Sequence, residues 1–156
     1  MRDRMTMGAL GVLLVLGSVS GQPVETKGAA AEEIARLLEV HRTEYLKGDA
    51  DAWAALYAEN AIFASGARSI EGRQAIREYF AQVFKDFPTR TASVHSMRVR
   101  VYNEATSPTA IINLDNDATR TDASGKQLIL NFRESLVFVK IHGKWLIVDH
   151  HASARP

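Results

Sequence analysis

The sequence contains no cysteine. Disulfide bonds, thiolate metal sites and a cysteine nucleophile are therefore excluded, and any chemistry must use oxygen and nitrogen groups. The absence of thiols is also compatible with an oxidising compartment, where a stray thiol is a hazard.

The chain also lacks an excess of charge of one sign. Its 19 lysines and arginines nearly balance 18 aspartates and glutamates, which leaves a formal net charge of +1. Such a chain has no net field to hold nucleic acid or an anionic membrane, so we expect no nucleic-acid partner. With 156 residues, it is long enough for one hydrophobic core and too short for two comfortable domains.

The one extended apolar run lies at the amino terminus. Arg2 and Arg4 precede a run from Met7 to Val19, and small residues follow it. The run is too short to cross about 30 Å of hydrocarbon comfortably, so it predicts a signal peptide over residues 1–21. An uncleaved anchor is the alternative. After cleavage we expect a flexible leader over 22–28, a domain over 29–156, and a secreted or periplasmic protein without stable membrane insertion.

Helical spacing dominates the first half of the remaining chain. Apolar positions at intervals of three and four residues predict a helix over 29–47, which Gly48 ends. A short second helix is predicted over 50–57 and a strand over 61–64. A third helix follows Gly72, and Pro88 prevents its continuation.

The second half is predicted as four strands, over 92–102, 109–119, 127–140 and 144–153. The last two strands are joined by His142 and Gly143, which predicts a two-residue hairpin turn with Ile141 facing Lys144.

Uninterrupted pairing of this hairpin would place Ser135 opposite His150 and Glu134 opposite His151. Both faces of the hairpin would then be largely apolar. Because a solvated face should be polar, we expect helices to cover one face and a second copy to cover the other, in a homodimer or larger ring.

Several short strings resemble proteins of the nuclear transport factor 2-like superfamily. YLKGD at 45–49, LYAENA at 56–61 and EGRQAIR at 71–77 resemble the front half of SnoaL-like proteins. GKWLIVDHH at 143–151 resembles the association domain of calcium/calmodulin-dependent kinase II and its bacterial relatives. The resemblance implies an α+β fold in which three amino-terminal helices pack on a strongly curved antiparallel sheet, a cone-shaped α+β barrel around a pocket.

Proteins of this superfamily include isomerases, dehydratases, cyclases, binding modules and assembly hubs, so the resemblance alone transfers no activity. Ketosteroid isomerases carry a carbonyl-polarising tyrosine and a catalytic aspartate where this chain has His41 and Ser65. Their second aspartate aligns near Val137 or Ser135, so this isomerase chemistry is not expected. The kinase association domain lines its pocket with arginines, for which Arg133 is the nearest candidate.

His41 and His150 are the candidate catalytic residues. A histidine titrates near neutral pH and can act as a general base or bind a polar group. For His41, a buried imidazole bonded to backbone or water is the alternative. Arg133 and Ser135 are predicted on the same sheet face as His150, where the three side chains would bind a carboxylate or an enolate-like oxygen.

The other candidate ligand-binding residues are either aromatic or polar strand residues. The four aromatic residues either line a pocket or belong to an ordinary core, and the same two alternatives hold for His95. Asp115 supplies a buried acid only if its side chain turns inward. Its surroundings do not predict a calcium site, because the later glycine and glutamate of an EF-hand loop are missing. These candidates are Trp53, Tyr57, Phe63, Tyr79, His95 and Asp115.

We expect no metal site. His150 and His151 fall on opposite faces of a regular strand and cannot chelate one ion together. The predicted pairing of His151 with Glu134 is interpreted as a cross-strand ion pair.

The sequence therefore predicts an exported pocket protein that binds a small, partly apolar ligand and uses no cofactor. One alternative is a cofactor-independent isomerase, cyclase or dehydratase with a histidine base. Another is a homo-oligomeric assembly or accessory domain, which the two apolar sheet faces favour.

Overall fold

The computed structural model describes residues 28–155, so the predicted signal peptide over 1–21 and all but the end of the predicted leader lie outside the described residues. The helices are α1 (Ala29–Lys47), α2 (Ala50–Ala54) and α3 (Arg73–Asp86). The strands are β1 (Tyr57–Ser65), β2 (Arg68–Glu71), β3 (Thr89–Tyr102), β4 (Thr109–Thr121), β5 (Gln127–Ile141) and β6 (Lys144–Ala154). Within 28–155, no helix is long and apolar enough to cross a membrane.

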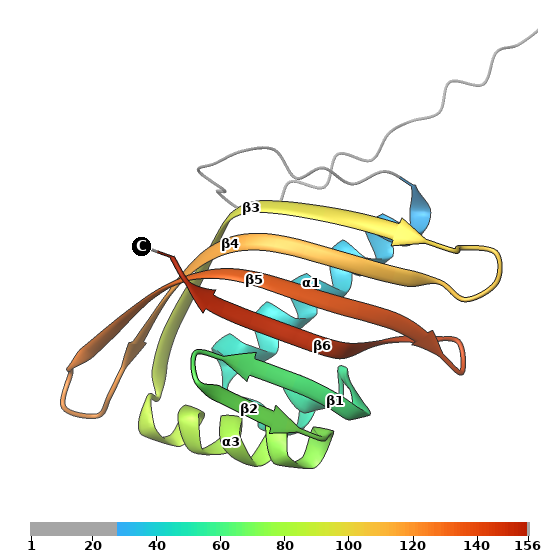
Figure 1. Cartoon of the computed structure of the whole chain (residues 1–156). Helices are drawn as coiled ribbons and strands as arrows, with labels where there is room; N and C mark the ends of the chain where they lie inside the picture. The colour runs from blue at the N-terminus through green and yellow to red at the C-terminus, as the bar shows by residue number, and fades with distance from the viewer. Residues whose placement is uncertain (1–27, 156) are drawn as a thin grey trace, which may run out of the picture.

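The strands form one curved sheet in the order β2–β1–β6–β5–β4–β3. Helix α1 crosses one face of this sheet, and α3 lies below β2 (Figure 1). The predicted α+β fold of three helices on a strongly curved sheet is confirmed. The sheet stays open, with β2 and β3 as its edges, and it is not wholly antiparallel, because β1 runs parallel to β6.

Helix α1 forms because its apolar residues recur on one side. Ile34, Leu38 and His41 are buried on that side, and Gly48 ends the helix in a left-handed conformation with φ 79°. A glycine at this position avoids the steric cost that a Cβ atom would carry.

Arg90 on β3 holds the ends of two helices together. Its guanidinium donates to the carbonyl oxygens of Tyr45 (2.9 Å) and Leu46 (3.1 Å) at the end of α1. It also donates to the carbonyls of Phe84 (3.3 Å) and Phe87 at the end of α3. Carbonyls at a helix end have no partner within the helix, so one side chain here satisfies two ends at once.

The second helix is shorter than predicted. It ends at Ala54, and Tyr57 begins β1 instead of ending a helix. The reason is tertiary: Tyr57 pairs with Ile147 of β6, and the Ile147 N–H donates to the Leu56 carbonyl at 2.8 Å. Strand pairing therefore overrides the local helical spacing, and the short β2 at the sheet edge was not predicted.

The hairpin between β5 and β6 is confirmed at its turn but not along its length. His142 and Gly143 both have positive φ angles, as a two-residue turn requires, and Ile141 faces Lys144. A β-bulge lies between the pairs at Phe138 and Val137 and inserts one extra residue into β6. The predicted pairs beyond the bulge were therefore wrong by one residue: Leu136 faces His150, Ser135 faces His151 and Glu134 faces Ala152.

A second irregularity interrupts β3 at His95. Val94 pairs with Asn116, whereas Ser96 pairs with the adjacent Asp115, so His95 is the extra residue. The long strands bend strongly at one end of the sheet (Figure 1). The bulge reverses which side chains face the helices, since Met97 is buried on one side of it and Val94 lies inward on the other.

We expect Gly48→Ala to lower the free energy of unfolding by about 2–3 kcal/mol. An alanine here would have to keep the positive φ, and its Cβ would lie 2.5 Å from the Arg90 Nη2, which has to leave its carbonyl partners. Gly66→Ala is the matched control, because Gly66 has φ 58° but no atom within 4 Å of the place that a Cβ would occupy, and should cost only about 1–2 kcal/mol. Urea denaturation measures both, and equal losses would contradict the role assigned to Arg90.

Candidate functional site

A cavity of about 260 Å³ lies between the helices and the sheet. Most of its wall is apolar and comes from all three helices and from five strands, including Leu38, Trp53, Phe63, Tyr79, Phe80, Leu114 and Phe132. The polar residues in the wall are fewer and comprise Ser65, His41, Arg42, Tyr45, Asn116, Arg120, Glu134 and His150. A largely apolar enclosure with a few polar groups is typical of a small-molecule site.

Both candidate catalytic histidines line this cavity. His41 reaches it from the buried side of α1, as the helical spacing predicts, and is 8% exposed. His150 reaches it because the β6 bulge turns the following residues over, and it is 4% exposed. The two imidazole rings are 5.6 Å apart, centre to centre.

Tyr57 connects the two histidines from behind the cavity wall. Its hydroxyl lies 3.1 Å from His41 Nε2 and 2.7 Å from His150 Nδ1. Its side chain is fully buried. Trp53 packs beside this group in a tilted arrangement, with its ring centre 4.7 Å from that of His41.

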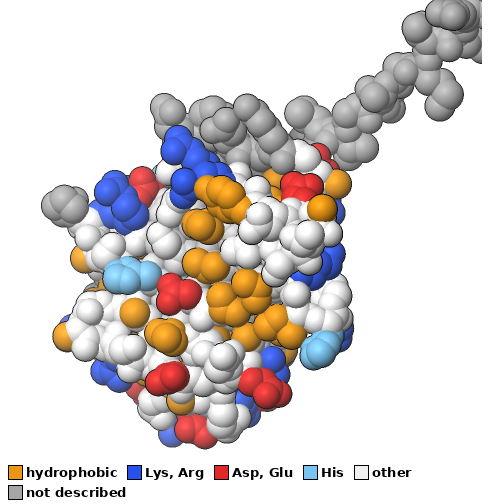
Figure 2. All heavy atoms as spheres, turned by 45° about the vertical axis from the view of Figure 1, so that its right-hand side comes forward, with side chains coloured by type: hydrophobic (Ala, Val, Ile, Leu, Met, Phe, Trp, Pro, Cys, Tyr) orange, Lys and Arg blue, Asp and Glu red, His pale blue; other side chains and the backbone are white. Residues whose placement is uncertain are grey.

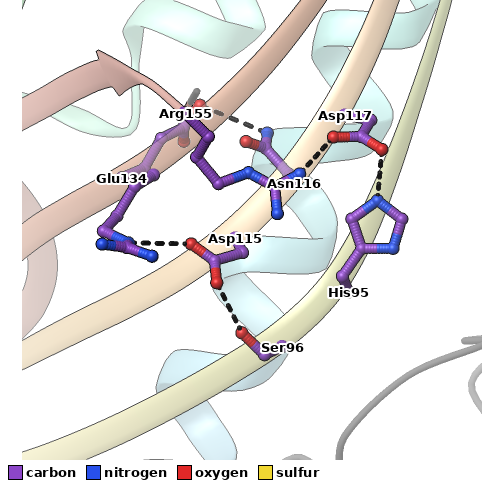
Figure 3. A network of polar contacts seen from close by, with 8 residues as sticks. His95, Ser96, Asp115, Asn116, Asp117, Glu134 and Arg155 are labelled. Atoms are coloured by element: carbon purple, nitrogen blue, oxygen red, sulfur yellow. Dashed lines mark hydrogen bonds and ion pairs between the residues drawn. The ribbon is translucent and has the colours of Figure 1, made fainter.

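Glu134 and Asn116 extend the chain on the other side of His150. The Glu134 Oε2 lies 3.2 Å from His150 Nε2, and the Asn116 amide donates to Glu134 Oε1 at 3.2 Å. Figure 3 shows Asn116 and Glu134 pointing toward one another from neighbouring strands. Five side chains from α1, β1, β6, β5 and β4 are therefore connected in one continuous network.

The network has one consistent assignment of hydrogens when Glu134 is a carboxylate and His150 is neutral. His150 Nε2–H then donates to Glu134, so the Nδ1 of a neutral His150 accepts from the Tyr57 hydroxyl. The Tyr57 oxygen in turn accepts from His41 Nε2–H. This assignment leaves His41 Nδ1 as an acceptor, without a hydrogen-bond partner among residues 28–155.

Burial favours the neutral forms of His41 and Tyr57. Desolvation, and to a smaller extent the nearby His150, lowers the pKa of His41 well below its usual 6.5. Desolvation, with a smaller contribution from Glu134, raises the pKa of Tyr57 well above its usual 10.0. Both shifts follow from removing a charged form from water.

Arg120 marks a second polar region of the cavity. It lies four residues along β4 from Asn116, which is about 13 Å in a strand. Its Nε donates to the Tyr45 hydroxyl at 2.9 Å. Burial, and to a smaller extent the nearby charge of Arg120, lowers the pKa of Arg90. Arg42 also lines the cavity but is already paired with Glu39.

The structure places four predicted ligand-binding residues away from the cavity, namely Arg133, Ser135, His95 and Asp115. The Arg133 side chain is 71% exposed and donates to Asp115 at 3.1 Å, and Ser135 accepts from Asn113 at 2.8 Å. His95 is paired with Asp117 on the outer side of the bend, as Figure 3 shows. The bulges explain these positions: they place Arg133 and Ser135 on the sheet face opposite His150, and His95 off the inner face.

Trp53, Phe63 and Tyr79 line the cavity as predicted, and Tyr57 lies directly behind it. The sequence interpretation missed Asn116 and Arg120 and assigned Glu134 to an ion pair with His151. The alternation of Leu114, Asn116, Ala118 and Arg120 along β4 is a signal that places them on one face. Within residues 28–155, no group of three histidine, aspartate or glutamate side chains is arranged to hold a metal ion.

We expect His41 to make stability depend on pH. Its folded-state pKa lies below the unfolded value of 6.5, so acid protonates the unfolded chain first and favours unfolding. The free energy of unfolding should fall by about 1 kcal/mol between pH 7.5 and 5.5 because of this residue. In His41→Gln that part of the fall should vanish, as measured by urea denaturation at both pH values. Equal pH slopes in the two proteins would contradict a neutral buried His41.

The comparisons with known proteins agree with this architecture. Residues 30–156 match the family model of the calcium/calmodulin-dependent protein kinase II association domain. A comparison with curated protein sequences gave no match.

Three solved structures illustrate the likeness. A protein from Xanthomonas campestris assigned to these association domains has a TM-score of 0.74 and 24% identity over 90% of this chain and 99% of that one. A nuclear transport factor 2-like protein from Salmonella enterica has a TM-score of 0.68 and 21% identity, over 80% of this chain and 90% of that one. The association domain of the C. elegans kinase has a TM-score of 0.63 and 19% identity, over 80% of this chain and 95% of that one. These identities establish the nuclear transport factor 2-like fold alone, whereas the family match over residues 30–156 shows that this chain belongs to the calcium/calmodulin-dependent protein kinase II association domain family.

Proposed function

We propose that this chain binds a small, partly apolar molecule in the cavity. The observation that carries the proposal is a mostly aromatic and aliphatic cavity with the His41–Tyr57–His150–Glu134 network at one end and Arg120 at the other. Its volume of about 260 Å³ lies near the lower end of ligand pockets. A molecule with one or two rings fits this size.

The polar groups indicate the chemistry of the ligand. Arg120 has no acidic partner among the described residues, so a carboxylate or similar anion would complement it. At the other end, His41 and His150 line the cavity, and a polar group of the ligand would bind to their ring nitrogens. Trp53 Nε1 and Asn116 Oδ1 have no hydrogen-bond partner in the described part of the chain, but they are buried too deeply for a molecule in the cavity to reach.

Export is part of this proposal and is supported by the amino-terminal sequence pattern over 1–21. The cavity would then operate in the periplasm or outside the cell. Amino-terminal sequencing of the exported protein should begin near Gln22, and an intact Met1 would contradict cleavage.

We expect 3-phenylpropionate to bind with a higher affinity than 3-phenylpropanamide, because only the acid carries a charge for Arg120. Arg120→Gln should weaken binding of the acid at least about tenfold, or 1.4 kcal/mol, and should leave the amide unchanged. Arg100→Gln is the matched control, since Arg100 is exposed on the outer side of β3 and bonds to Asn113. Isothermal titration calorimetry measures all combinations. Equal affinities of the two arginine variants for the acid would contradict the assigned ligand orientation.

A second candidate function is self-association through the helix-free sheet face. Ile111, Val137, Val139, Leu146 and Val148 are only half-buried on that face within one chain. Figure 2 shows hydrophobic side chains gathered over the middle of the view, with charged groups around them. The family match to an association domain also favours a homo-oligomer.

Val137→Lys should dissociate the oligomer, because the lysine would have to lose its hydration in an apolar interface. The expected readout is a fall to the monomer mass in sedimentation velocity, with an unchanged circular dichroism spectrum. Ile129→Lys is the control, since Ile129 is 68% exposed near the tip of the β4–β5 hairpin. A monomeric wild type, or an equal mass for both variants, would count against this interface.

A further inference from the structure

The hydroxyl of Tyr57 makes more contacts than a core tyrosine needs. One hydrogen bond would satisfy it, but it lies within 3.1 Å of one cavity histidine and 2.7 Å of the other. Both histidines line the cavity, whereas Tyr57 does not. The hydroxyl therefore joins two groups that can contact a bound molecule, at a point that the molecule does not reach.

The hydrogen bonds also have a direction. In the assignment given above, every donor points from His41 toward Glu134, and His41 Nδ1 is left as the acceptor at the start of the chain. The chain of hydrogen bonds begins at an unpartnered acceptor at the cavity and ends at a carboxylate. Along such a chain, each proton can move from its donor to the neighbouring acceptor.

We propose that the cavity is an acid–base catalytic site in which His41 takes a proton from the bound molecule and Tyr57 relays a proton to His150 beside Glu134. This proposal rests on the proposed binding of a small molecule in the same cavity. His41 is the catalytic residue, and Tyr57, His150 and Glu134 act through it.

The protons balance along the path. A C–H bond of the ligand breaks, its proton goes to His41 Nδ1, and its electron pair stays on the ligand as a delocalised anion. The proton on His41 Nε2 passes to the Tyr57 oxygen, and the hydroxyl proton of Tyr57 passes to His150 Nδ1. His41 and Tyr57 end neutral, and His150 becomes an imidazolium 3.2 Å from the Glu134 carboxylate. Reversal of these steps returns a proton to another carbon, which is an isomerisation.

The relay explains how a buried histidine can act as a base. Burial lowers the pKa of His41, so a positive charge held on that ring would be unfavourable. Moving the charge to His150 places it next to a carboxylate whose side chain is 12% exposed. The other titratable side chains around the cavity are Arg42 and Tyr45 on α1, Tyr79 on α3 and Arg120 on β4, and none of them is a carboxylate.

The same features define the substrate class. An imidazole base in an apolar site suits a small carbon acid, such as a carbonyl compound with a C–H bond next to the carbonyl group. The reaction needs no cofactor, because the proton leaves and returns through residues of the chain itself.

The test uses 5-nitrobenzisoxazole, a small aromatic carbon acid. A base removes the C3 proton, the N–O bond breaks, and the coloured 2-cyano-4-nitrophenolate forms without a co-reactant. We expect kcat/KM at pH 7.5 to fall at least about tenfold in His41→Gln, in Tyr57→Phe and in Glu134→Gln. His151→Gln should match the wild type, because His151 is exposed on the same strand. A wild-type rate in Tyr57→Phe, with its fold confirmed by circular dichroism, overturns the relay. If Tyr57→Phe does not fold, a wild-type rate in Glu134→Gln overturns it.

Histidine side-chain ¹⁵N NMR of the full domain provides a readout that does not depend on the probe. In the wild type, His41 should carry its hydrogen on Nε2 and should stay neutral as the pH is lowered through its usual pKa of 6.5. In Tyr57→Phe the hydrogen of His41 should no longer be fixed on Nε2. A hydrogen on Nδ1 of the neutral wild-type His41, or identical His41 spectra in both proteins, overturns the relay.

Calorimetry with 5-nitrobenzisoxazole separates the two proposals. Saturable binding without ring opening overturns the catalytic relay and leaves the binding function standing. Absence of binding by this probe and by 3-phenylpropionate counts against the binding function, and the NMR titration then decides whether the relay exists in the unliganded protein.

Discussion

A buried hydroxyl group must find its hydrogen bonds inside the protein, and Tyr57 meets this requirement with two histidines. These bonds connect the start of β1 to α1 on one side and to β6 on the other. Through Glu134 and Asn116 the same network reaches β5 and β4. The polar end of the cavity is therefore held by the same contacts that fix the helix and the sheet relative to each other, so its geometry is set before any ligand binds.

Two bulges determine which side chains meet in that network. The bulge in β6 turns His150 to the helix-covered face, and the bulge at His95 turns Val94 inward beyond it. Without the extra residue in β6, His150 would lie beside Arg133 and Ser135 on the outer face, and Tyr57 would lose a partner. Bulges also bend the strands locally, and this bend helps to form the space between the sheet and the helices.

The two faces of the sheet are suited to different tasks. The inner face contributes Glu134, Asn116 and His150 to the cavity, whereas the outer face carries half-buried apolar side chains such as Val137 and Val139. The side chains of the polar network lie on the inner side of the sheet, away from the proposed assembly face. The proposed binding and the proposed assembly can therefore be tested by separate substitutions.

Features that depend on neighbours along the chain could be predicted from the sequence. The spacing on α1 placed His41 inward, the His142–Gly143 turn set the last hairpin, and short strings identified the superfamily. Contacts between distant segments set the end of α2, the partners of His150 and the positions of Arg133, Ser135 and His95 outside the cavity. The physical reason is that side chains alternate with a period of two, so one inserted residue exchanges the faces of all that follow. Whether a residue is inserted depends on packing against other strands and helices, which leaves no periodic trace in the strand itself.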